Sequence, residues 1–122
     1  MRFRLVVGAL LVVAPVGVAQ AMPVATFLDK ATALKRKGPL ALMSGDLKLL
    51  TNQIKQDSAE LRAQNQALEA AGKRKRYCTP AGFGMDQKQV LQAMENVPAP
   101  QRASLSTRDA LRAYLAQVHP CR

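Results

Sequence analysis

The chain is poor in the residues that build most catalytic and nucleic-acid-binding sites. Its 122 residues include no tryptophan, one histidine and two cysteines, and aromatic residues make up 4%. Proteins that bind single strands stack bases on aromatic side chains set among cations, a pattern absent from this sequence. The histidine, His119, precedes Pro120 and has no carboxylate pair or metal-ligand spacing around it. We therefore expect a protein that is not an enzyme and has no metal, no cofactor and no nucleic-acid partner.

Acidic residues are also scarce, with eight Asp and Glu against 18 Lys and Arg and a formal net charge of +10. The excess is uneven, because residues 22–72 have seven cations and five acids whereas residues 73–122 have nine and three. Such an excess indicates either a solvated surface that selects no partner or a cationic face for an anionic envelope surface. The candidate contacts of that face are Lys73, Arg74, Lys75, Arg76, Arg108 and Arg112.

Long apolar runs are missing except for one near the N-terminus, from Leu5 to Ala14. Two arginines precede it, and the Ala-x-Ala motif that ends at Ala21 follows it, an arrangement typical of a secretory signal peptide. We predict that residues 1–21 are removed, that Met22 begins the mature protein, and that this protein resides in the periplasm without a membrane span. The alternative is an uncleaved anchor, but a bilayer span needs about twenty apolar residues and this run has ten.

The two cysteines, Cys78 and Cys121, are expected to form one disulfide because the chain begins like an exported protein. Closing a loop of this size contributes about 4 kcal/mol in the chain-entropy model, a large share of the stability of a small domain. The alternative, two unpaired buried thiols, is the better prediction only for a cytosolic chain.

The first half of the mature chain, residues 22–76, predicts two helices. Pro23 is suited to a first turn, and Gly38-Pro39 ends an amphipathic helix whose apolar residues recur every three or four positions. Ser44 can cap a longer helix to about Ala71, whose sparse apolar stripe consists of Leu47, Leu50, Ile54, Leu61 and Leu68. Because residues 55–66 are mainly polar, we expect them to be exposed, to fray or to await a partner.

Four consecutive cations follow that helix, at residues 73–76. Together with Gly72 they predict a solvated, protease-sensitive hinge, and a heparin-type binding patch is the alternative.

Residues 77–122 predict a helical hairpin closed by the disulfide. Asp86 with Gln89 forms one capping-box pattern, for a helix to about Asn96, and Ser106 with Asp109 forms a second. The final helix should end before Pro120, with a buried face made of Leu111, Tyr114, Leu115 and Val118. The predicted fold class is all-α, a small helical domain with one disulfide.

Several of these features together resemble the Rap/Tai family. They are Cys78-Thr79-Pro80, the glycine-containing turn at 81–84, the Asp-capped helix, the break at Val97-Pro98 and the closing His119-Pro120-Cys121. Members of this family are small exported helical proteins that bind and block cell-wall amidase toxins. The resemblance covers about residues 77–121. This chain has one cysteine pair, whereas members of the family usually have an additional pair. It implies a non-enzymatic, immunity-like inhibitor or adaptor for a periplasmic protein, and the alternative is a cationic structural protein of the envelope.

Overall fold

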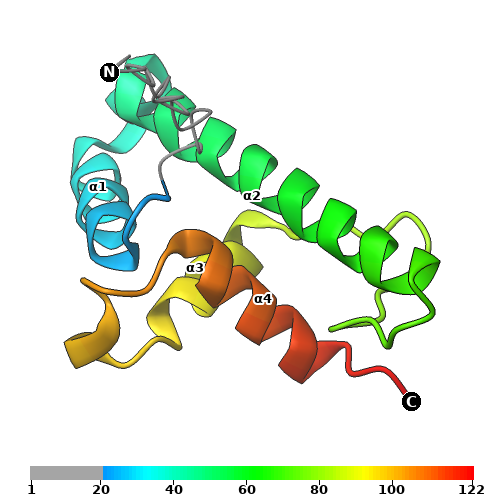
Figure 1. The fold of residues 1–122 in the computed structure, drawn as a ribbon. Coiled ribbons are helices and arrows are strands. Elements are labelled where there is room, and N and C mark those ends of the chain that lie inside the picture. Colours follow the sequence, from blue (N-terminus) through cyan, green and yellow to red (C-terminus); the bar gives the residue numbers. More distant parts are fainter. Residues whose placement is uncertain (1–20) are drawn as a thin grey trace, which may run out of the picture.

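Four α-helices and two short 3-10 helices make up most of residues 21–122, the part of the chain that the structure, a computed structural model, describes (Figure 1). The all-α fold class is therefore confirmed. Apart from Ala21, the predicted signal peptide lies outside the described residues. In chain order the elements are α1 (Val24–Lys37), η1 (Gly38–Met43), α2 (Gly45–Ala70), α3 (Gln87–Glu95), η2 (Ala99–Gln101) and α4 (Thr107–Val118).

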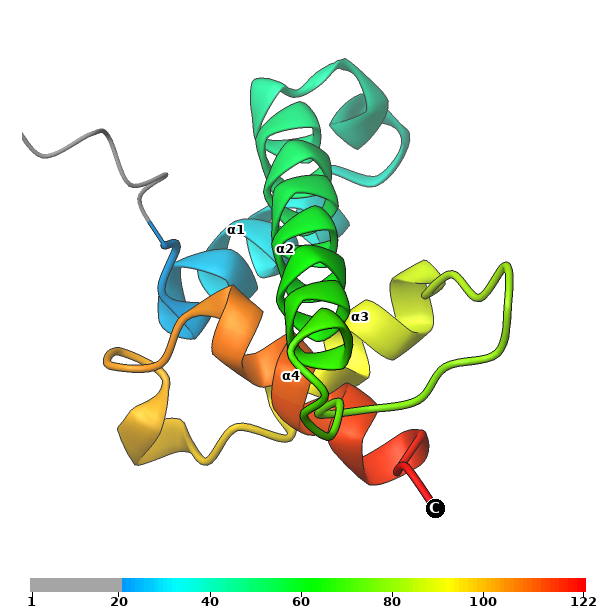
Figure 2. The same ribbon diagram turned by 45° about the vertical axis from the view of Figure 1, so that its right-hand side comes forward.

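The long helix α2 lies across α1 and α4, and α3 packs against these same two helices (Figure 2). All four α-helices contribute side chains to one hydrophobic core, including Phe27 of α1, Leu61 of α2, Met94 of α3 and Leu111 of α4. Residues from both sides of the basic run 73–76 therefore share a single core.

The first described residues pair with the segment that leads into α4. The Val24 N–H donates to the Leu105 carbonyl at 2.9 Å, and the Thr107 N–H donates to the Met22 carbonyl at 2.9 Å. These bonds satisfy N–H groups that a helix start leaves without an intrahelical partner. Pro23 lies between them in an extended conformation and is the N-cap of α1, one position before the first turn in which we expected it.

The helix starts follow the capping patterns of the sequence. Ser44 Oγ accepts the Asp46 N–H at the start of α2. Both predicted capping boxes are formed, because Asp86 and Gln89 exchange hydrogen bonds at α3, and Ser106 and Asp109 do so at α4. These caps place the two C-terminal helices where the local sequence predicts them.

Two expectations about burial need correction. Residues 55–66 were expected to be exposed, to fray or to await a partner; they are helical and mostly exposed, but Asp57, Leu61 and Asn65 are buried within the domain at 0%, 2% and 8% exposure. Their spacing of four aligns them on one face of α2, and two of the three are polar, so apolar periodicity could not reveal that face. Val118, expected to be buried, is 46% exposed because it is the last residue of α4, beyond the buried Leu111 and Leu115.

Candidate binding site

The predicted disulfide between Cys78 and Cys121 is present and joins the loop before α3 to the end of α4. Two further contacts hold the same place. The Cys78 N–H donates to the His119 carbonyl at 2.8 Å, and the rings of Phe83 and His119 meet edge to face with centroids 4.5 Å apart. His119 is thus a half-buried packing residue at the C-cap of α4.

The basic run is fixed to the rest of the molecule by α2 and by the C-terminus. Asn65 Oδ1 accepts the Arg76 N–H at 3.0 Å, and Asn65 Nδ2 donates to the Tyr77 carbonyl at 2.9 Å. Arg74 Nη2 donates to the Cys121 carbonyl at 2.9 Å, and Lys75 pairs with Glu69 at 3.5 Å. The segment that the sequence predicts as a hinge therefore has side-chain attachments along most of its length.

A groove of about 390 Å³ lies beside this segment, between α2, the loop that carries Phe83, and α4. Its lining is apolar at the base and polar at the edge. The lining residues are Ser58, Leu61, Arg62, Asn65, Gln66, Glu69, Lys75, Tyr77, Thr79, Phe83, Gly84, Met85, Leu111 and Leu115.

The charges of the groove favour recognition of an anionic or carbonyl-rich group. The single carboxylate of the lining, Glu69, is paired with Lys75, whereas Arg62 forms no ion pair among the described residues. Burial raises the pKa of the Tyr77 phenol, and the Arg62 guanidinium opposes that shift only partly. Tyr77 therefore stays neutral at physiological pH, and Arg62 is the available charge at the edge of the groove.

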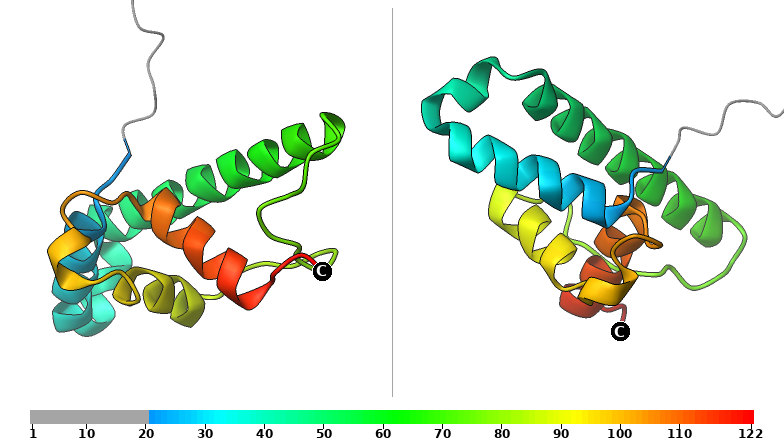
Figure 3. Two further views of the ribbon diagram at one scale, coloured as in Figure 1. Left: turned by 60° about the horizontal axis from the view of Figure 1, so that its bottom comes forward. Right: turned by 90° about the vertical axis from the view of Figure 1, so that its left-hand side faces the viewer.

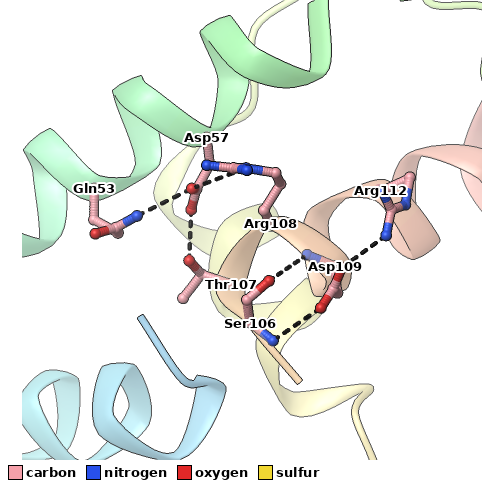
Figure 4. Close-up of polar contacts among 7 residues, drawn as sticks. All are labelled: Gln53, Asp57, Ser106, Thr107, Arg108, Asp109 and Arg112. Carbon is pink, nitrogen blue, oxygen red and sulfur yellow. Dashed lines mark hydrogen bonds and ion pairs between the residues drawn. The ribbon is translucent and has the colours of Figure 1, made fainter. Parts of the chain in front are cut away.

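Three of the predicted anionic-partner contacts are paired with acids of the chain itself, namely Lys75 with Glu69 and two arginines of α4. Figure 4 shows Arg108 beside the buried Asp57 and Arg112 beside Asp109. The Nε of Arg108 lies 3.7 Å from Asp57 Oδ1, and Nη2 of Arg112 lies 2.7 Å from Asp109 Oδ1. The four cations of residues 73–76 lie on the loop just after α2. The six predicted contacts therefore do not form one continuous face of unpaired cations.

Asp57 has two hydrogen-bond donors besides this arginine. Thr107 Oγ1 donates to Asp57 Oδ2 at 2.5 Å, and Gln53 Nε2 donates to Asp57 Oδ1 at 3.0 Å. Thr107 is the first residue of α4, so the carboxylate lies at the positive end of that helix. The cluster joins α2 to α4, with Asp57 and Thr107 fully buried at its centre and Gln53 and Arg108 partly exposed at its edge.

The described residues hold no group of three or more His, Cys, Asp or Glu side chains that could bind a metal ion. Among the helices formed by residues 21–122, none has both the length and the apolar character needed to cross a membrane. No family model, curated protein or solved structure matches the chain.

Proposed function

We propose that the protein is an exported, non-enzymatic binding protein of the periplasm that inhibits or recruits another protein through the groove between α2, the Phe83 loop and α4. The partner class is the one implied by the Rap/Tai resemblance, a cell-wall amidase effector. Export is supported by the leader-like residues 1–21 and by the disulfide, since such bonds persist in oxidising compartments.

The observation that carries the proposal is the fixed geometry of the groove walls. One wall is α2. The opposite wall is held by the disulfide, by the Phe83 and His119 rings and by the two hydrogen bonds of Asn65. A loop held in one conformation before binding loses less entropy when a partner docks, which raises affinity.

The test is direct binding to the cell-wall amidase effectors encoded by the same genome. We expect a complex that lowers amidase activity on peptidoglycan. Arg62→Glu should weaken it at least about tenfold, because a like charge would face the anionic group of the partner. Lys55→Glu is the matched control, since Lys55 is an exposed cation of α2 outside the groove lining. Failure of every such amidase to bind, or equal losses in the two variants, would contradict the proposal.

A second proposal, an envelope protein that binds anionic surfaces, is favoured by the exposure of Lys73, Arg74 and Arg76 on one short loop. Binding of this kind weakens steeply as ionic strength rises. Affinity for an anionic polymer or membrane that did not change between low and high salt would exclude it.

A further inference from the structure

Exposed apolar side chains are concentrated at one end of the molecule. Of the five large apolar residues that are exposed among the described residues, four lie within positions 40–49. Leu40, Leu42 and Met43 of η1 are 70%, 80% and 88% exposed, and Leu49 follows in the early part of α2 at 45%. Exposed apolar side chains on a protein surface are normally scattered singly, and a cluster of them indicates an interaction site.

The turn η1 is a projecting tip. It joins α1 to α2 and lies at an extremity of the molecule in every view (Figure 1, Figure 2, Figure 3). The basic run and the groove lie toward the other end of α2, whose 26 residues span about 39 Å. The tip is therefore separate from the surface assigned to the protein partner.

Cations surround this tip. Lys35, Arg36 and Lys37 form the last turn of α1, and Lys48 lies in α2 just after the tip, and all four are exposed. Residues 30–56 have one carboxylate, Asp46, and it is paired with Lys30 at 3.2 Å. The apolar tip thus has a positive surround with its single negative charge compensated.

From this arrangement we infer that η1 docks the protein on an anionic lipid bilayer, with Leu40, Leu42 and Met43 inserted among the acyl chains and Lys35, Arg36, Lys37 and Lys48 at the headgroups. Aliphatic side chains gain free energy at the acyl boundary, and basic residues near an anionic membrane surface add to it. The inference shares the anionic-surface chemistry of the second proposal but places the contact at the tip, away from residues 73–76, and it does not depend on the first proposal.

A second copy of the chain is a poorer occupant of the same tip. Three side chains on a convex turn cover far less than the roughly 800 Å² that each partner buries in a stable protein interface. Two copies meeting tip to tip would also bring like charges together, which is unfavourable. A lipid surface deforms around a convex tip and supplies the opposite charge.

The absence of tryptophan permits a specific optical test. Leu42→Trp places a single indole on the tip, and Val118→Trp places one on an exposed apolar position of α4 as the matched control. The protein is purified from the envelope of an expressing bacterium and mixed with vesicles of phosphatidylglycerol and phosphatidylcholine. We expect a blue shift of tryptophan emission for Leu42→Trp with these vesicles, none with phosphatidylcholine alone, and none for Val118→Trp.

Vesicle sedimentation measures the contribution of each part. Leu42→Ser combined with Met43→Ser should reduce binding at least about tenfold, and Arg36→Gln about fivefold. Arg122→Gln, which changes an exposed cation at the C-terminal end and outside both proposed surfaces, is the control and should leave binding unchanged. If Lys73→Gln abolishes binding while the serine variant retains it, the second proposal stands and the tip does not dock. Equal binding to both vesicle types, or a concentration-dependent dimer that the serine variant abolishes, would also overturn the inference.

Discussion

At the scale of single residues, the most consequential side chain is Asp57. A carboxylate with no solvent exposure is tolerated only when charge and hydrogen bonds compensate its lost hydration. Here the compensation comes from Thr107, Gln53 and Arg108, two of which belong to α4. The two partners that belong to α4, Thr107 and Arg108, hold that helix in position along α2, because a slide of one helix would leave the buried carboxylate without them.

Replacing Asp57 should therefore be costly. Asp57→Ala removes the acceptor of the buried Thr107 hydroxyl and the counter-charge of Arg108, and we expect a loss of about 3 kcal/mol in the free energy of unfolding, measured by urea denaturation. Asp57→Asn keeps an acceptor for Thr107 and should lose less. Asp29→Ala is the control, since Asp29 is exposed on α1. A loss in Asp57→Ala no larger than that of the control would show that the cluster does not stabilise the fold.

At the scale of elements, the start of α4 shows how a cap becomes sensitive to pH. Burial alone would raise the pKa of Asp109. The hydrogen bonds from the Ser106 backbone and side chain, and then the charge and hydrogen bond of Arg112, outweigh burial, so the pKa of Asp109 is lower than normal. Because the folded-state pKa lies below the unfolded one, the stabilisation is complete above the unfolded value of about 4. It disappears as pH falls through the folded value.

Asp109→Asn should remove this dependence. Because the side chain is 37% exposed, solvent screening limits the effect, and we expect the variant to be less stable than the natural protein by about 0.5 kcal/mol at pH 7. The difference should shrink toward zero as pH falls below the unfolded value of about 4 and through the lower folded-state pKa, because the carboxylate is then progressively protonated. Thermal unfolding of both proteins across this range is the measurement. A constant difference at all pH values would mean that the charge of Asp109 is not the stabilising feature.

A second element-scale consequence concerns the basic run after α2. The two hydrogen bonds of Asn65 hold the backbone of Arg76 and Tyr77, and each contributes about 1 kcal/mol. Asn65→Ala should raise the open population of this loop by about thirtyfold and speed tryptic cleavage at residues 73–76 to match. Asn52→Ala, the same change on an exposed part of α2, should leave the cleavage rate unaltered. Equal rates in the two variants would indicate that the loop is held elsewhere.

At the scale of the whole molecule, the sequence predicted those features, such as the helix caps, that depend only on residues close together along the chain. The caps at Asp86 and Ser106 each join residues three positions apart, so a short stretch of sequence is enough to predict them. Thr107 and Asp57 are separated by 50 residues, and no local pattern shows that they meet. The groove is of the same kind, since it forms only when α2, the Phe83 loop and α4 come together. The one sequence signal for this buried face of α2 was the i, i+4, i+8 spacing of Asp57, Leu61 and Asn65. Because two of these three residues are polar, the pattern resembles that of a solvated face.

The disulfide is a main contributor to the stability of this small domain. It closes a loop with a sequence separation of 43 and joins the ends of the segment that contains α3 and α4. Replacing both cysteines by serine should lower the free energy of unfolding by about 4 kcal/mol in the chain-entropy model. Arg74→Gln, which removes only the hydrogen bond to the Cys121 carbonyl, should cost about 1 kcal/mol or less and serves as the control. Both values come from urea denaturation, with the natural protein checked by alkylation under non-reducing conditions. Two thiols that react without reductant, or an unchanged urea midpoint in the serine variant, would contradict a stabilising bond and, with it, the fixed groove wall that the proposed partner binding requires.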